Sequence, residues 1–312
     1  MEKQKHLFEI LKSRISCRQR LSDVIEELLG LSADSAYRRI RGETELSFSE
    51  LNKICNKFNL SMDDILNYKS SQGILFYYVS LLQIINTLKS DSDKEIISIA
   101  RSIPFYYSGI FPELAYMSLY SWNNAMNCTK TSYNAFVNNL DKEEIKSIYS
   151  QVYCTFNSTP SKEIWNVQTI DHALRILDYY FAVGAFEKKD TILHLLNQLS
   201  DLMDKVNQYA EDGHKGGEQK TPFYMYDCSV DLDSNSTILI KGDLLFLYLR
   251  LNMFNFIETN NELFCDTALR WNNYLISKSI QISGISSAKQ RYCFFESAKN
   301  KIEGLVNKIK NS

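Results

Sequence analysis

The chain has 312 residues, enough for two or three domains, and its 45% hydrophobic and 23% charged residues are ordinary for a globular protein with a substantial core. The formal net charge of −2 excludes a protein that coats nucleic acid regardless of sequence, because such coating needs an overall basic charge. With only 11 Gly and 4 Pro, the composition favours helices over loops.

Two helices are predicted ahead of a first tight turn. Apolar residues recur at helical spacing over residues 3–15. A second helix begins after Leu21, with Ser22 as its N-cap, and ends at Gly30. Glycine closes a helix at low cost because it adopts the left-handed C-cap conformation.

Three more helices follow the turn. Ser32 is the predicted N-cap of the third helix, which ends at Gly42. Ser47 and Glu50, three residues apart, form the capping box of a fourth helix. A fifth, short helix is predicted at residues 61–66. Five helices with independent start and stop signals indicate a compact N-terminal helical domain.

The third helix carries a cluster of basic side chains, Arg38, Arg39 and Arg41. Taken alone, arginines on a short helix are more often a solvated face than readers of bases. Here they follow a helix and a tight turn, which is how many proteins present side chains to a DNA groove. This context favours DNA contact over the solvated face.

The stretch GLSADSAYRRIRGE at residues 30–43 and the stretch FNLSMDDIL at residues 58–66 resemble the XRE family of phage-repressor/Cro-like regulators, which have a lambda-repressor-like fold. The match spans about 50 residues. The string SADSAYRRIRGE also resembles a variant common in regulators from Bacteroidetes. The resemblance implies a DNA-binding transcriptional regulator.

The resemblance further implies a recognition helix at residues 32–41 that enters the major groove of double-stranded DNA. By position, Ala33, Asp34 and Arg38 would reach base edges. The chemistry agrees, because arginine reads guanine through two hydrogen bonds and a carboxylate accepts one from the amino group of cytosine. Tyr37 could touch a thymine methyl group.

Three further residues, Ser22, Ser32 and Arg41, would hold phosphates by the same resemblance. Backbone N–H groups at the start of a helix attract phosphate, which supports a contact at Ser32. The complete predicted DNA-binding set is Ser22, Ser32, Ala33, Asp34, Ser35, Tyr37, Arg38, Arg39 and Arg41.

The remaining chain is predicted to be a separate helical domain. We expect the helix-turn-helix domain at residues 1–68, a polar linker at 69–73 and a regulatory or dimerisation domain at 74–312. Apolar periodicity predicts helices in this last part at residues 74–88, 95–103, 112–126, 142–156, 168–186, 191–210, 243–258, 261–277 and 287–309, and β-favouring residues predict one β-hairpin at about 223–241. The expected fold class is therefore mainly α.

No motif in the sequence indicates an enzyme, a metal site or another cofactor, and we expect none. The seven cysteines are odd in number, widely scattered and without zinc-ligand spacing, which is typical of reduced thiols in the cytoplasm. The most apolar run, residues 74–88, is too short to span a bilayer, so we expect no membrane contact.

The sequence predicts a cytoplasmic, sequence-specific transcriptional regulator. We expect a homodimer on a pseudo-palindromic operator, since two-fold proteins read two-fold sites. The second domain leaves room for an effector, either a small molecule or a protein. The alternative is a protein-interaction module whose helix-turn-helix no longer binds DNA, which the neutral charge permits. Salt dependence separates these two interpretations.

Overall fold

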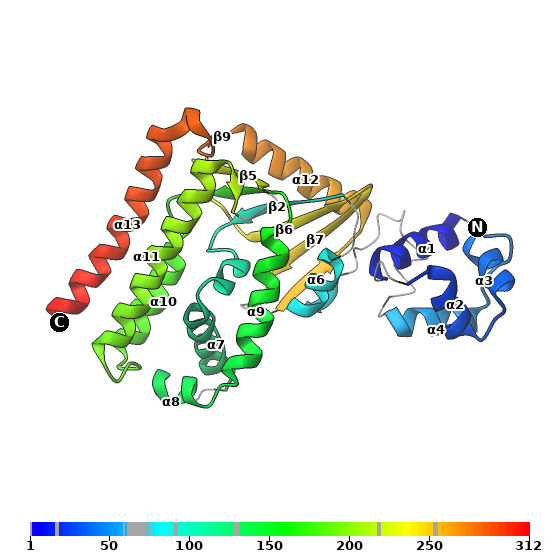
Figure 1. The fold of residues 1–312 in the computed structure, drawn as a ribbon, viewed down its shortest axis with the longest axis horizontal. Coiled ribbons are helices and arrows are strands. Elements are labelled where there is room, and N and C mark those ends of the chain that lie inside the picture. The colour runs from blue at the N-terminus through cyan, green and yellow to red at the C-terminus, as the bar shows by residue number, and fades with distance from the viewer. Residues whose placement is uncertain are drawn as a thin grey trace.

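The structure is a computed structural model and describes residues 2–15, 19–58, 60, 74, 76–89, 93–127, 131–216, 220–251 and 255–312. Figure 1 shows a small helical domain at the N-terminal end of the chain and a larger domain in which helices pack on a β-sheet. The predicted fifth helix at 61–66 and the predicted linker at 69–73 lie outside the described residues. In the described part of the chain, no helix is long and apolar enough to cross a membrane.

The N-terminal domain contains the helices α1 (Glu2–Arg14), α2 (Leu21–Leu29), α3 (Ala33–Ile40) and α4 (Phe48–Phe58), which confirms the first four predicted helices. Each is amphipathic and contributes its apolar face to one small core. Leu7, Leu11, Ile25, Ala36 and Ile54 are completely buried there. The alanine in α3 allows close packing, since a small side chain lets α3 lie directly on α2 and against α1.

The larger domain is built on a mixed sheet of nine described strands in the order β1-β8-β7-β6-β2-β3-β5-β4, with β9 also paired to β5. Strand β3 is parallel to β2 and to β5, and the other pairs are antiparallel. The strands are β1 (Tyr77–Ser80), β2 (Lys94–Ala100), β3 (Ser161–Trp165), β4 (His214–Lys215), β5 (Thr221–Cys228), β6 (Asn235–Lys241), β7 (Leu244–Arg250), β8 (Asn255–Thr259) and β9 (Ser279–Gln281).

Helices cover the two faces of this sheet unequally. The main core lies between one face and the helices α6 (Leu81–Leu88), α7 (Pro112–Asn127), α8 (Tyr133–Asn138), α9 (Lys142–Asn157), α10 (Asp171–Ala182), α11 (Lys189–Asp212) and α13 (Ala288–Asn311), with the 3-10 turn η1 (Phe105–Gly109). Helix α12 (Glu262–Ser277) covers the opposite face (Figure 1). Successive strand residues alternate between these faces: Leu239 joins the main core, whereas Ile238 packs under α12.

The prediction of a mainly helical second domain with one β-hairpin is wrong. Residues 95–103 and 243–258, predicted as helices, contain β2 and the pair β7–β8, and residues 74–88 contain β1 before α6. The segment at about 223–241 does contain two strands, but β5 and β6 are separated in the sheet by β2 and β3, so they form no hairpin. The predicted helices at 112–126, 142–156, 168–186, 191–210, 261–277 and 287–309 are confirmed by α7 and α9–α13.

The reason for this error is burial on both faces of the sheet. Every residue from Ile96 to Ala100 in β2 is buried, so the strand lacks the alternation of apolar and polar residues that marks a half-exposed strand. In β7 the run Leu244–Tyr248 is also continuously apolar, and the three consecutive residues Phe246, Leu247 and Tyr248 are buried. A short, continuously apolar segment reads as a buried helix or a buried strand with equal ease.

Candidate DNA-binding surface

The turn between α2 and α3 fixes how the recognition helix leaves the domain. Gly30 has φ of +66°, a left-handed conformation that suits glycine, and its neighbour Leu31 donates its N–H to the carbonyl of Glu26. Ser32 is the N-cap of α3, and its hydroxyl accepts the N–H of Ser35 at 3.4 Å. Both predicted boundaries of this turn are confirmed.

Helix α3 has one buried and one exposed face. Ala36 is fully buried and Ile40 packs partly against the same core. The opposite face presents Ala33, Asp34, Tyr37, Arg38 and Arg41, all exposed. These positions follow helical spacing, so they lie on one side of the helix and can face a common ligand. The side chain of Ser32 is exposed at the start of the same helix.

Arg38 and Arg41 share one carboxylate. Arg41 Nε lies 3.2 Å from Glu43 Oε1, and Arg38 Nε lies 3.9 Å from Glu43 Oε2. All three side chains are about half exposed, at 47–57%. Ion pairs in such a position contribute little to stability, because water competes for both partners. The two guanidinium groups can therefore exchange Glu43 for a phosphate or a base without loss to the fold.

Arg39 lies on a different side of the helix and is mostly buried. It forms an ion pair of 2.8 Å with Glu50 of α4 and donates a hydrogen bond to the carbonyl of Ser35. The other oxygen of Glu50 accepts the N–H of Ser47, which completes the predicted capping box of α4. Although desolvation acts in the opposite direction, hydrogen bonds from Ser47 and Arg39 hold the pKa of Glu50 below its ordinary value.

Gln4 of α1 forms hydrogen bonds with the backbone from Arg39 to Leu46. Its amide nitrogen donates to the carbonyls of Arg39 and Thr44, and its amide oxygen accepts the N–H of Leu46. One side chain thus satisfies three backbone groups between α3 and α4. Sequence reasoning missed this role, and it also missed the roles of Glu43 and Glu50 as partners of the arginines. Their opposite charge near the arginine cluster was the available signal.

Ser22 does not belong to the exposed group. It is buried, lies inside the first turn of α2 and donates to Asp23 Oδ1, and the N-cap position of α2 is occupied by Arg20 instead. The prediction of Ser22 as N-cap is therefore wrong. Its predicted phosphate contact stays a prediction. Because the hydroxyl of Ser22 is buried, it is poorly accessible to a phosphate. Ser35 is half-buried on α3 beside Ser32.

The geometry has three parts: a turn closed by a left-handed glycine, a capped helix with an exposed basic face, and a small helical core that holds both. These parts define the class of a helix-turn-helix domain. Residues 5–85 match the BetR domain family, a helix-turn-helix-type DNA-binding domain.

The BetR match covers well under half of the chain. It ends inside α6 and includes β1, so it extends past the predicted domain boundary into the sheet of the larger domain. The match does not confirm the XRE assignment. No curated protein and no solved structure matches the chain.

Proposed function

We propose that the protein is a sequence-specific, DNA-binding transcriptional regulator that acts in the cytoplasm. The observation that carries this proposal is the exposed face of α3, which presents Arg38 and Arg41 together with the exposed helix start at Ser32. Helix 32–41 enters the major groove, as helices of this class do. Free thiols at the described cysteines suit a reducing compartment.

The residues on the exposed face divide into two roles in this proposal. Ala33, Asp34, Tyr37 and Arg38 point away from the core and contact base edges. Arg41 lies at the carboxyl end of α3, and with Ser32 at the other end it holds phosphates on the two sides of the groove. Arg39 is held by Glu50, so we assign it to positioning the helix, with any DNA contact of its own left as a prediction.

The second domain joins two copies of the chain and carries no catalytic step in this proposal. The outer face of α12 supports the first point, because Leu263, Trp271 and Tyr274 are exposed there at helical spacing, and the two aromatic rings stack on each other. An apolar stripe on a surface helix suits a two-fold contact between identical helices. Two helix-turn-helix domains joined in this way bind a pseudo-palindromic DNA site.

The test is selection from a randomised DNA library by the purified protein at two salt concentrations, followed by sequencing. We expect an enriched two-fold-symmetric site whose binding weakens steeply with salt, because phosphate contacts release counterions. The variant with both Arg38→Ala and Arg41→Ala should enrich nothing.

The alternative is a protein-interaction module with a helix-turn-helix that no longer binds DNA. The observation in its favour is that Glu43 neutralises part of the basic face. Absence of enrichment at low salt, for a chain that folds, would reject the regulator and favour this alternative.

A further inference from the structure

Three strand ends meet at one end of the large sheet. β6 runs antiparallel to β2, so the last residue of β2, Ala100, lies beside the first residue of β6, Asn235. β7 runs antiparallel to β6, so its last residue, Arg250, lies at the same end. The residues just after β2, Arg101 and Ser102, complete this edge. Strand ends are the usual place for ligand sites in sheets of this kind, because side chains from several strands converge there.

A cavity of about 500 Å³ opens at this edge between the strand ends and the helices α7 and α10. A narrower recess of about 80 Å³ adjoins it, since Ser102, His172, Ile176 and Arg250 line both. The recess runs between η1, α7, α10 and α11 and is lined mainly by apolar side chains: Ile103, Leu114, Met117, Leu177, Leu199 and Leu202.

The mouth of the cavity is basic. Arg101 of the β2 end, Arg175 of α10 and Arg250 of β7 line it with His172, and no Asp or Glu of the described residues lines the cavity or the recess. Arg101 donates to the backbone carbonyl of Asp233, and Arg175 to that of Asp171. Both acceptors are neutral carbonyls, so these two hydrogen bonds do not neutralise the charge of either guanidinium group.

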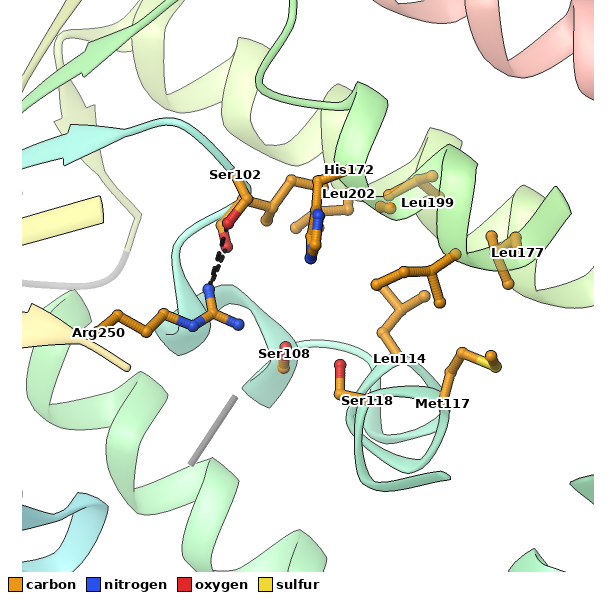
Figure 2. Close-up of a pocket in the computed structure, with 13 residues that line it drawn as sticks. Ser102, Ser108, Leu114, Met117, Ser118, His172, Leu177, Leu199, Leu202 and Arg250 are labelled. Carbon is orange, nitrogen blue, oxygen red and sulfur yellow. Dashed lines mark hydrogen bonds between the residues drawn. The ribbon is translucent and has the colours of Figure 1, made fainter. Parts of the chain in front are cut away.

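Arg250 is the innermost of these cations and is positioned by the β2 end. Its Nη1 donates to Ser102 Oγ at 3.4 Å and to the carbonyl of Ile103 at 3.3 Å. Figure 2 shows the guanidinium of Arg250, the ring of His172 and the hydroxyls of Ser108 and Ser118 directed toward one space. These groups form a polar entrance, and the leucines and Met117 lie beyond it.

The pKa of His172 is affected by the positive charges of the site. Desolvation, followed by the charges of Arg250, Arg175 and Arg101, lowers its pKa below the ordinary value. At neutral pH the imidazole is therefore uncharged and can donate one N–H hydrogen bond. A bound anion would lie in this positive field.

We propose that this cavity binds a small amphipathic carboxylate, whose charged head lies among Arg101, Arg175, Arg250 and His172 and whose apolar chain enters the recess. Guanidinium groups pair with planar or tetrahedral oxyanions through two parallel hydrogen bonds, which fits this choice of head group. The apolar recess excludes free inorganic phosphate as the best occupant, because it would leave that surface uncovered.

The probes are a series of straight-chain carboxylates from acetate to octanoate, the matching alcohols, and inorganic phosphate. Binding to the full chain is measured by isothermal titration calorimetry without DNA. We expect the carboxylates to bind with affinity that rises about threefold to fourfold for each added methylene until the recess is filled, and then levels off. The alcohols, which lack the charge, should not bind measurably.

Arg250→Gln should weaken the carboxylates by about tenfold or more, the loss expected for a hydrogen bond to a charged group. Because Arg250 also holds the β2 end, the exposed Arg175→Gln is a second variant, with the exposed Arg20→Gln of the N-terminal domain as its control. Ser118→Leu, which fills part of the recess, should make the affinity level off at a shorter chain.

The proposal would be overturned by three results: no saturable binding of any carboxylate, equal binding of alcohols, or affinity that does not depend on chain length. That the ligand acts as an effector of DNA binding rests on the proposed function, whereas the binding itself does not. The chain with Arg38→Ala and Arg41→Ala should bind octanoate as the unchanged chain does, so a failure of one proposal is distinguishable from a failure of the other.

Discussion

Arg39 and Glu50 join the recognition helix to the next helix through an ion pair of 2.8 Å. The same carboxylate caps α4 through Ser47, so one side chain sets both the start of α4 and the rotation of α3. Gln4 holds the carbonyl of Arg39 from α1. The recognition helix is therefore fixed from two sides, and two adjacent arginines, Arg38 and Arg39, face different environments.

Variants of Arg38 and Arg39 should distinguish a contact to DNA bases from the positioning of α3. Arg38→Ala should cost about 1–3 kcal/mol of DNA binding and relax the preference at one base position, because it removes a contact to a base edge. Its thermal stability should stay unchanged, since the side chain is half exposed and only weakly paired. Library selection and calorimetry on the same sample measure both quantities.

Arg39→Met should behave in the opposite way. It leaves Glu50 without its partner in a mostly buried position, so the N-terminal domain loses stability, and binding to every DNA sequence weakens together. A sequence preference that changes with Arg39→Met and persists with Arg38→Ala would show that the helix is rotated by one position from the proposed register.

Glu43 offers a variant that should strengthen binding. Its carboxylate lies between Arg38 and Arg41 and must move away from the phosphates of a bound duplex. Glu43→Gln removes this repulsion and frees both arginines, so we expect affinity to increase by about threefold to tenfold at low salt and less at high salt, where charges are screened. Fluorescence anisotropy with the selected operator measures this.

The matched control for Glu43→Gln is Glu45→Gln. Glu45 is also exposed, and among the described residues the structure gives it no ion pair with α3. If both variants raise affinity by the same factor, the gain comes from net charge and not from release of the two arginines.

The two domains differ in how much of their structure the sequence could predict. In the N-terminal domain, the predicted helix caps at Gly30, Ser32, Ser47 and Glu50 depend on partners only a few residues away. The structure confirms these caps. Gln4 could not be predicted, because its partners at residues 39–46 are about 40 positions away along the chain. Local signals encode helix ends, whereas contacts between elements depend on the fold.

The candidate cavity in the second domain could not be predicted from the sequence for the same reason. Arg101 and Arg250 are far apart along the chain and meet because β2, β6 and β7 pair side by side. Helix α10 brings Arg175 to the same cavity. That pairing could not be foreseen while β2 and β7 were read as helices. From the sequence, His172 stands next to apolar residues in a helical pattern, which is typical of an ordinary core or surface histidine.

Disruption of the α12 surface should dissociate the proposed dimer. Trp271→Glu with Tyr274→Glu places two charges on the exposed stripe and should raise the dimer dissociation constant by at least about tenfold, since aromatic side chains dominate the energy of most interfaces. Sedimentation velocity measures the change. The control is Tyr179→Glu, an exposed tyrosine on α10. A dimer that survives the double change would place the contact elsewhere.

Glu163 and Lys215 supply a prediction for the large domain. Both are completely buried in the core. Glu163 accepts hydrogen bonds from Tyr107 Oη at 2.9 Å and Trp165 Nε1 at 2.7 Å, and Lys215 donates to the carbonyls of Phe156 and Thr159. At pH 6, where Lys215 of the unchanged chain is protonated, Glu163→Leu should destabilise the domain by about 3–5 kcal/mol, because it removes the counter-charge of a buried cation. Adding Lys215→Met should restore part of that loss, which urea unfolding followed by tryptophan fluorescence would show.

The same pair sets an expected pH dependence. Desolvation lowers the pKa of Lys215 to about 7, while Glu163 acts to raise it. The unfolded chain keeps the ordinary value of 10.5, so above pH 7 it binds more protons than the folded chain, and the free energy of unfolding should rise with pH. The slope can reach about 1.4 kcal/mol per pH unit. Below pH 7 both states are protonated and this slope disappears.

Two variants test the assignment of that slope, measured by urea unfolding from pH 6 to pH 9. Glu163→Gln removes the charge that favours the protonated lysine, so the pKa of Lys215 should fall further and the rise should begin below pH 7. The double variant Glu163→Gln with Lys215→Met lacks both groups, so its slope between pH 7 and pH 9 should be smaller than that of the unchanged chain by about 1.4 kcal/mol per pH unit. A slope equal to that of the unchanged chain would mean that another group governs the pH dependence.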